Sequence, residues 1–209
     1  MTKLTSVALL TLAFAGTSAL FAQAPAAPAT PAGGPPAPRV RVSPHDTITA
    51  NVGGRGDPRK ITITYGRPYS KDPKTGEIRK IWGGLVKSDT PERLGSDEAT
   101  LLITPVPLTI GSTTIPAGAH TLYIVAGESG AKLAFSSNIA KWGIPVDDKH
   151  DIARVDLVKS SLENSVDQLT LTLERELGGA DGKTPTDNYK LHIWWEKTKF
   201  SLPFTAKSS

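Results

Sequence analysis

Cysteine is absent from all 209 residues of the chain. Its absence excludes disulfide bonds, thiolate nucleophiles and metal centres ligated by cysteine. A lipid anchor on a cysteine is excluded for the same reason. The fold must therefore depend on its hydrophobic core, and the length suits one core rather than two large domains.

Two further patterns are missing: no stretch has a convincing helical period of apolar residues, and no run is strongly basic. The 24 lysines and arginines are spread along the chain with 20 acidic residues, for a net charge of +4. A nucleic-acid surface needs basic side chains gathered in a patch or stripe, so we expect no nucleic-acid partner. No feature of the sequence specifies an oligomeric state.

A long apolar run is present at the N-terminus. Lys3 precedes apolar residues 7–20, and small residues follow at Ala22 and Ala24, which is the pattern of a secretory signal peptide. Cleavage after either alanine fits, although Pro25 disfavours the second. The run is shorter than the roughly 20 residues of a spanning helix. We expect residues 1–22 to be removed, no membrane span in the mature form, and a periplasmic or extracellular bacterial protein.

Residues 23–38 consist mainly of alanine and proline and carry no apolar period, so we expect a disordered tether. The folded domain is expected over residues 39–206. There, short runs of alternating apolar and polar residues are separated by glycine and proline turns. The clearest run, 168–176, places Leu169, Leu171 and Leu173 on one face. This pattern predicts an all-β fold of about ten short strands with little or no helix, as a single antiparallel β-sandwich or jelly-roll-like domain.

Several segments together resemble a bacterial family catalogued as domain of unknown function 2911. They are SPHDTI, ITITYGRP, KIWGGLV, RLGSDEAT, LTIGSTTIPAGAHTLY, KWG, DIARVDL and LHIWWEKTKFSLPF, in the family's order over nearly all of residues 43–204. The resemblance implies an exported β-rich domain and brings no established activity, cofactor or catalytic residue. The chain departs from the family where Glu92 stands in place of a tryptophan before Arg93, and where the 70–80 loop is longer.

Most candidates for chemistry lie between the strand-like runs 61–68 and 98–103. Arg67 and Arg93 could bind a carboxylate, phosphate or sugar, and Asp97 and Glu98 could act as acid and base. The structural alternative is that one of these arginines pairs with Glu98 and holds a long loop onto the sheet.

The four histidines show no spacing that would place two metal ligands on one element. We therefore expect no metal and no cofactor. His45 precedes an aspartate and could serve as a base, although such a pair more often forms a cap or turn. No GxSxG motif is present, and the SxxK match at Ser129 falls in a glycine turn rather than at a helix start.

Trp82 and Trp142 are each followed by glycine and lie in expected loops, where an indole could stack on a sugar or anchor the loop. Trp194 and Trp195 alternate, so at least one should be buried. We expect an exported, non-catalytic domain that binds a small molecule, a glycan or an envelope protein. The predicted ligand-binding residues are Arg67, Trp82, Arg93, Glu98 and Trp142. The alternative is a small hydrolase of glycans or esters that uses Glu98 or Asp97 with His45 and Arg67.

Overall fold

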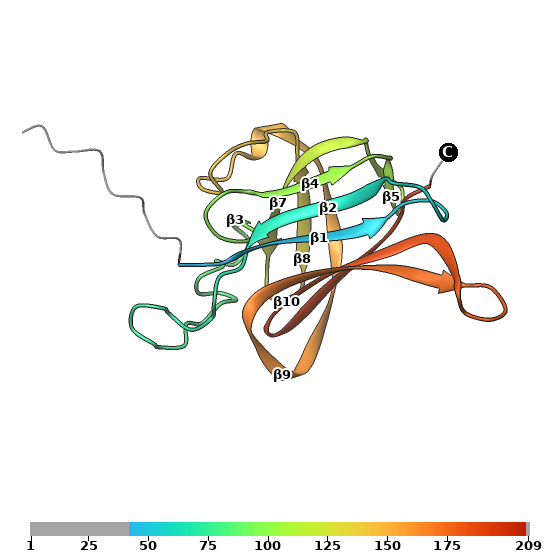
Figure 1. Ribbon diagram of the computed structural model, residues 1–209. Helices are drawn as coiled ribbons and strands as arrows, with labels where there is room; N and C mark the ends of the chain where they lie inside the picture. The colour runs from blue at the N-terminus through green and yellow to red at the C-terminus, as the bar shows by residue number, and fades with distance from the viewer. Residues whose placement is uncertain (1–41, 208–209) are drawn as a thin grey trace, which may run out of the picture. The chain divides into compact units, whose positions relative to one another are not determined.

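The computed structural model describes residues 42–207, so the expected signal peptide and tether lie outside the described residues. Figure 1 shows the strands. They are β1 (His45–Asn51), β2 (Lys60–Gly66), β3 (Pro91–Arg93), β4 (Thr100–Thr104), β5 (Leu108–Ile110), β6 (Thr113–Ile115), β7 (Gly118–Ala126), β8 (Ala131–Ser136), β9 (Asp151–Gly178) and β10 (Thr184–Thr205). One short 3-10 helix, η1 (Asp148–His150), precedes β9.

All ten strands belong to one antiparallel sheet, which confirms the all-β prediction. Nine of them follow the order β1-β2-β4-β7-β8-β9-β10-β5-β6, and β3 pairs separately with β7. β3 and β4 lie along consecutive parts of β7, because Arg93 is opposite Tyr123 and Thr100 is opposite Leu122. The segment between them, residues 94–99, leaves the sheet and carries Asp97 and Glu98.

Two of the ten strands are much longer than expected. β9 has 28 residues and β10 has 22, because each joins two of the runs that the sequence indicates. Their pairing register shifts near Glu196, so both strands bend without ending. Figure 1 shows the second half of β9 and the first half of β10 passing below β1 and β2.

This bend gives the single sheet the two layers of a sandwich. Buried side chains of β2, β4, β7 and β8 meet those of β10 and the second half of β9 in one core cluster. Ile63 and Leu133 contribute from the first layer, and Leu171, Ile193 and Phe200 from the second. Trp195 is buried while Trp194 stays partly exposed, as the alternation predicts.

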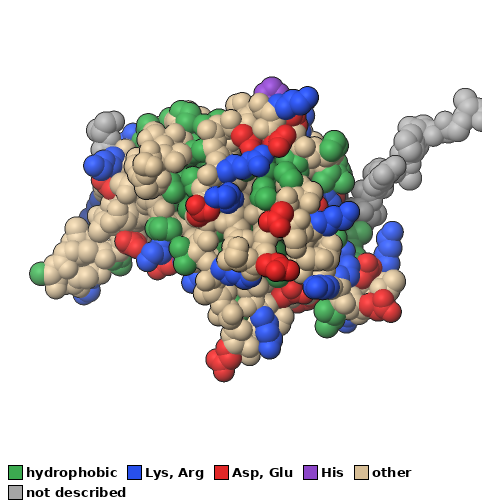
Figure 2. All heavy atoms as spheres, turned by 180° about the vertical axis from the view of Figure 1, so that it is seen from behind, with side chains coloured by type: hydrophobic (Ala, Val, Ile, Leu, Met, Phe, Trp, Pro, Cys, Tyr) green, Lys and Arg blue, Asp and Glu red, His purple; other side chains and the backbone are tan. Residues whose placement is uncertain are grey.

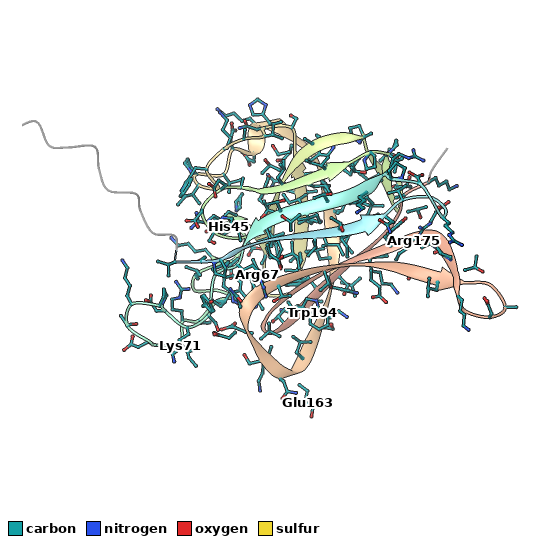
Figure 3. All side chains as sticks on the ribbon, in the orientation of Figure 1. His45, Arg67, Lys71, Glu163, Arg175 and Trp194 are labelled. Atoms are coloured by element: carbon teal, nitrogen blue, oxygen red, sulfur yellow. The ribbon has the colours of Figure 1, made fainter. Side chains whose placement is uncertain are left out.

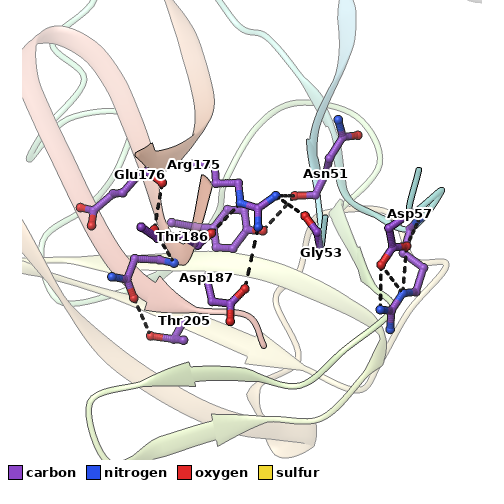
Figure 4. A network of polar contacts seen from close by, with 11 residues as sticks. Asn51, Gly53, Asp57, Arg175, Glu176, Thr186, Asp187 and Thr205 are labelled. Carbon is purple, nitrogen blue, oxygen red and sulfur yellow. Dashed lines mark hydrogen bonds and ion pairs between the residues drawn. The ribbon is translucent and has the colours of Figure 1, made fainter. Parts of the chain in front are cut away.

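The layers are also joined by polar contacts at two places. Next to β2, the backbone amides of Ser70 and Leu169 donate to Asp167 and Pro68. At the other end, Arg175 donates to the carbonyl oxygens of Thr186 and Gly53, both at 2.6 Å (Figure 4). This second contact attaches the turn after β1 to the β9–β10 hairpin.

Acidic and basic side chains are interspersed on the face shown in Figure 2, with no basic stripe. This distribution agrees with the absence of basic runs in the sequence. Over residues 42–207, no helix has the length and apolar character needed to cross a membrane.

Candidate functional site

The site begins with the outward-facing residues of three neighbouring strands. Thr64 of β2 lies opposite Leu101 of β4, which lies opposite Thr121 of β7. Leu102 and Leu122, next to them in the chain, are buried in the core. Since side chains alternate along a strand, Thr64, Leu101 and Thr121 form a row on the outer face of the sheet.

A loop after β8 crosses one end of this row. The backbone amide of Ala99 donates to the Lys141 carbonyl at 3.0 Å, and that of Gly143 donates to the Asp97 carbonyl at 3.0 Å. Between these two hydrogen bonds, Glu98 and Trp142 form an isolated β-bridge. The loop is therefore fixed to the 94–99 segment, and the Trp142 side chain remains 55% exposed beside the row.

His45 meets the carboxylates of the 94–99 segment from the start of β1. Its Nε2 atom lies 3.1 Å from Glu98 Oε2 and 3.9 Å from Asp97 Oδ2. Asp97 adopts a positive φ of 62°, which turns the chain between the two carboxylates. All three residues are candidates in the sequence analysis. The fold brings His45 next to the two carboxylates, which lie about 50 residues later in the chain.

These parts surround a cavity of about 650 Å³ on the outer face of the sheet. Its floor is the row at Leu101, one wall is Trp142, and its polar groups include His45, Glu98 and Lys141. This volume lies within the range of small-molecule sites, which are mostly apolar with a few placed polar groups. The lining residues are His45, Thr64, Tyr65, Gly66, Glu98, Ala99, Leu101, Thr121, Ala140, Lys141 and Trp142.

A second cavity of about 310 Å³ lies next to the first. Both cavities are lined by Ala99, Thr121, Lys141 and Trp142. Tyr123 lines the second one and donates its hydroxyl to Asp151 at 2.5 Å. Burial, helped by Asp151, raises the pKa of Tyr123, so this hydroxyl stays protonated at neutral pH. The two cavities therefore share the wall that includes Lys141 and Trp142.

The two candidate arginines do not pair with Glu98. Arg67 donates from Nε to the Leu169 carbonyl at 3.2 Å and from Nη2 to Thr170 Oγ1 at 3.0 Å. Its Nη1 atom lies 3.5 Å from Asp46. The structural alternative, a long loop held onto the sheet through Glu98, is thus wrong for Arg67, which attaches the end of β2 to β9. Figure 3 labels Arg67 and His45 at the same end of β1 and β2.

Arg93 lies closer to the cavities. It donates from Nη1 to the Asp97 carbonyl at 3.3 Å, and its side chain packs against Gly143. It lines the 310 Å³ cavity and a separate one of about 210 Å³, which Asp97 also lines. Arg93 therefore supports the backbone between the cavities rather than facing the largest one.

Trp82 makes its contacts with a different set of residues. Its indole nitrogen donates to the Trp195 carbonyl at 3.4 Å, and its ring packs edge-on against Phe200 at 5.1 Å. It lines a different cavity of about 430 Å³ with Lys80 and Lys159. Of the predicted ligand-binding residues, Glu98 and Trp142 thus share the 650 Å³ cavity, and Arg67, Arg93 and Trp82 have other surroundings.

The remaining histidines are held by separate partners. His120 hydrogen-bonds the Pro116 carbonyl at 2.8 Å, and His150 lies 3.6 Å from Asp147. Within the described part of the chain, no three histidine, cysteine or acidic side chains are grouped as a metal site requires.

Sequence reasoning missed Leu101, Thr121 and Lys141. The alternation in residues 99–104 and 119–126 marks Leu101 and Thr121 as outward-facing, but a leucine on that face gives no sign of what covers it. Lys141 precedes Trp142 and Gly143 in a loop whose crossing over the sheet depends on tertiary hydrogen bonds.

Comparison with known proteins gives a family without an assigned activity. No curated protein and no solved structure matches the chain. A family model described as a protein of unknown function, DUF2911, matches residues 43–204, which cover all the strands that form the cavities. The chain belongs to the DUF2911 family.

Proposed function

We propose that this protein binds a small neutral saccharide, without altering it, in the 650 Å³ cavity beside Trp142. The observation that carries the proposal is the combination of an exposed indole, the apolar floor at Leu101, and the hydrogen-bonded pair of His45 and Glu98 in one cavity. A sugar ring offers an apolar face to an indole and hydroxyl groups at its edge.

The polar groups of the cavity also suit hydroxyl groups. Glu98 supplies an acceptor, Lys141 supplies donors, and the His45 ring supplies one or the other at each nitrogen. A hydroxyl both donates and accepts, so it can meet all three groups. Among the lining residues within 42–207, one carboxylate and one ammonium group give no strong excess of either charge, which favours a neutral ligand over an ion.

The position of the carboxylates favours binding over the hydrolytic alternative. Glycosidases place their two carboxyl groups on either side of the bond to be broken. Here Asp97 and Glu98 converge on one imidazole nitrogen, and Asp97 Oδ2 is buried without a hydrogen bond. Arg67 donates a hydrogen bond to the Leu169 carbonyl of β9, so its guanidinium group does not hold a substrate in the cavity.

Titration calorimetry of the purified protein with neutral mono- and disaccharides tests the proposal. Removal of the stacking surface in Trp142→Ala should weaken binding at least about tenfold, with Trp194→Phe as a control for an indole outside the cavity. Unchanged affinity in Trp142→Ala would refute the site. Release of a new sugar product would instead support the hydrolase.

The proposed place of action is outside the cytoplasm. Support comes from the signal-like residues 1–22 and the alanine- and proline-rich residues 23–38. Fractionation of producing cells, with the N-terminus of the recovered protein sequenced, should find the protein in the periplasm or medium starting after Ala22 or Ala24. An intact N-terminus in the cytoplasm would exclude export.

A further inference from the structure

A second group of chemically active side chains lies on the outer face of β10, outside the cavities described above. β10 bends near Glu196, whose φ is 52° and where the register against β9 shifts. Because of the bend, His192 and Ser201 approach each other although they are nine residues apart on one strand. Both alternate with core residues such as Ile193 and Leu202, so they lie on the opposite face.

The group consists of a hydroxyl, an imidazole and a carboxylate in hydrogen-bonded series. Ser201 Oγ lies 2.8 Å from His192 Nδ1, and His192 Nε2 lies 3.3 Å from Glu174 Oε2. An ionised carboxylate only accepts hydrogen bonds, so Nε2 carries the proton of the neutral ring. Nδ1 is then the acceptor, and the Ser201 hydroxyl donates to it. A hydroxyl, a base and a carboxylate that orients the base have the roles of a catalytic triad.

The surroundings keep the imidazole in its basic form. The His192 side chain is 8% exposed, and its ring meets the Trp194 ring edge-on at 5.9 Å. Burial lowers the pKa of His192, the hydrogen bond to Glu174 opposes this shift, and the charges of Lys199 and Lys190 add to the lowering. His192 is therefore neutral at pH 7 and able to take a proton.

Two of the three residues are accessible from solvent. Ser201 is partly exposed, and the Glu174 side chain is 64% exposed. The Lys199 ammonium group lies 4.6 Å from the centre of the Trp194 ring and adds a positive charge on the same face. Figure 3 labels Trp194 where β9 and β10 run close together.

We infer that Ser201 is a nucleophile activated by His192, with Glu174 as the positioning residue, and that it reacts with small activated esters. None of the three residues lines the cavities described above, so the ester would react at the open surface of β10. This activity is independent of the proposed saccharide site.

The reaction has two steps. Ser201 Oγ forms a bond to the ester carbonyl carbon while its proton passes to His192 Nδ1, and the alcohol leaves with that proton as its bond to the carbonyl breaks. Water then attacks the acyl-serine, giving its proton to His192. The acid is released, and the proton returns to Ser201.

Labelling with an alkyl fluorophosphonate at pH 7.5, followed by peptide mass spectrometry, tests the nucleophile directly. The Ser201 oxygen displaces fluoride and forms a stable phosphonate ester. Ser160 is an internal control, because it lies across the same strand pair and its hydroxyl donates to the Lys199 carbonyl rather than to a base. We expect Ser201 to be labelled at least about 100-fold faster than Ser160, a typical gain from general-base catalysis. Equal labelling of the two serines would overturn the inference.

Variants separate catalysis from structure. Ser201→Ala should abolish hydrolysis of 4-nitrophenyl acetate above background, and His192→Asn should lower it about 100-fold. Glu174→Gln should reduce the rate and move the pH at which the rate is half-maximal. The reason is that an amide replaces the carboxylate that orients the His192 ring and favours its protonated form. An unchanged pH profile in Glu174→Gln would remove Glu174 from the positioning role. Full activity in Ser201→Ala would overturn the site.

Discussion

At the scale of single residues, Tyr65 shows how one hydroxyl group joins the two layers. Its side chain is 1% exposed, and its oxygen accepts a hydrogen bond from the Leu171 amide at 2.9 Å. Tyr65→Phe leaves that buried amide without a partner, which costs about 1–3 kcal/mol. Urea denaturation should show this loss of free energy of unfolding. Tyr69→Phe is the control, since residues 42–207 offer its hydroxyl no hydrogen bond, and an equal loss there would refute the explanation.

Single residues also show what the sequence could and could not predict. Alternation alone predicts that Leu169 and Leu171 are buried, because the two faces of a strand meet different surroundings. Side-chain chemistry and neighbouring residues, rather than alternation, mark His45, Glu98 and Trp142 as candidates. The sequence does not predict that these three share a cavity, because the register of β1 on β2 and the hydrogen bonds of the 138–143 loop decide that. Nothing in the sequence marks Ser201 as a candidate residue, because only the bend of β10 brings it next to His192.

At the scale of elements, Arg175 connects β1 to the β9–β10 hairpin (Figure 4). Its guanidinium group donates to Thr186 and Gly53, and it lies 5.4 Å from the centre of the Tyr189 ring. Lysine keeps the charge but lacks the planar set of donors, so Arg175→Lys should lower the free energy of unfolding by about 2 kcal/mol.

Hydrogen exchange should show the local effect of Arg175→Lys as faster exchange in residues 52–59. Arg59→Lys is the matched control, because the Arg59 side chain pairs, among residues 42–207, only with the nearby Asp57. Similar losses of stability in both variants would mean that Arg175 does not connect the two elements.

The elements themselves were predictable in type but not in extent. Alternating runs at 153–159 and 168–176 indicate two strands, and the structure continues β9 through both. The intervening residues 160–167 are polar except for Leu162 and Val166 and lack an apolar alternation, so nothing local indicates that they stay extended. Pairing with β10 and contact with residues 68–70 hold them in place, and both are tertiary interactions.

At the scale of the whole molecule, stability should fall with acidification in two steps. The pKa of His192 is lowered from 6.5, chiefly by burial, so the unfolded state takes up protons first as the pH falls below 6.5. Stability is therefore full above that pH and declines as the pH falls toward the folded-state pKa. Hydrogen bonds from the Ser70 hydroxyl and the Lys71 amide lower the pKa of Asp167 below 3.8, which places a second decline below pH 3.8.

Urea denaturation over a pH series checks both steps. His192→Asn should flatten the curve between pH 7 and 5 and leave the lower decline, and Asp167→Asn should weaken only the lower one. A curve for His192→Asn parallel to that of the wild type would show that another group causes the upper decline.

The position of β10 between β9 and β5 in the sheet has a consequence for the order of assembly. β10 pairs with β9 and also provides the attachment for β5, and it contributes Phe200 and Leu202 to the core. Until β10 has joined the sheet, the apolar faces of β2, β4, β7 and β8 meet only the second half of β9. The sandwich can therefore close only after β10 has joined it, and a chain that ends before Phe200 should remain unfolded and a target for proteases and chaperones.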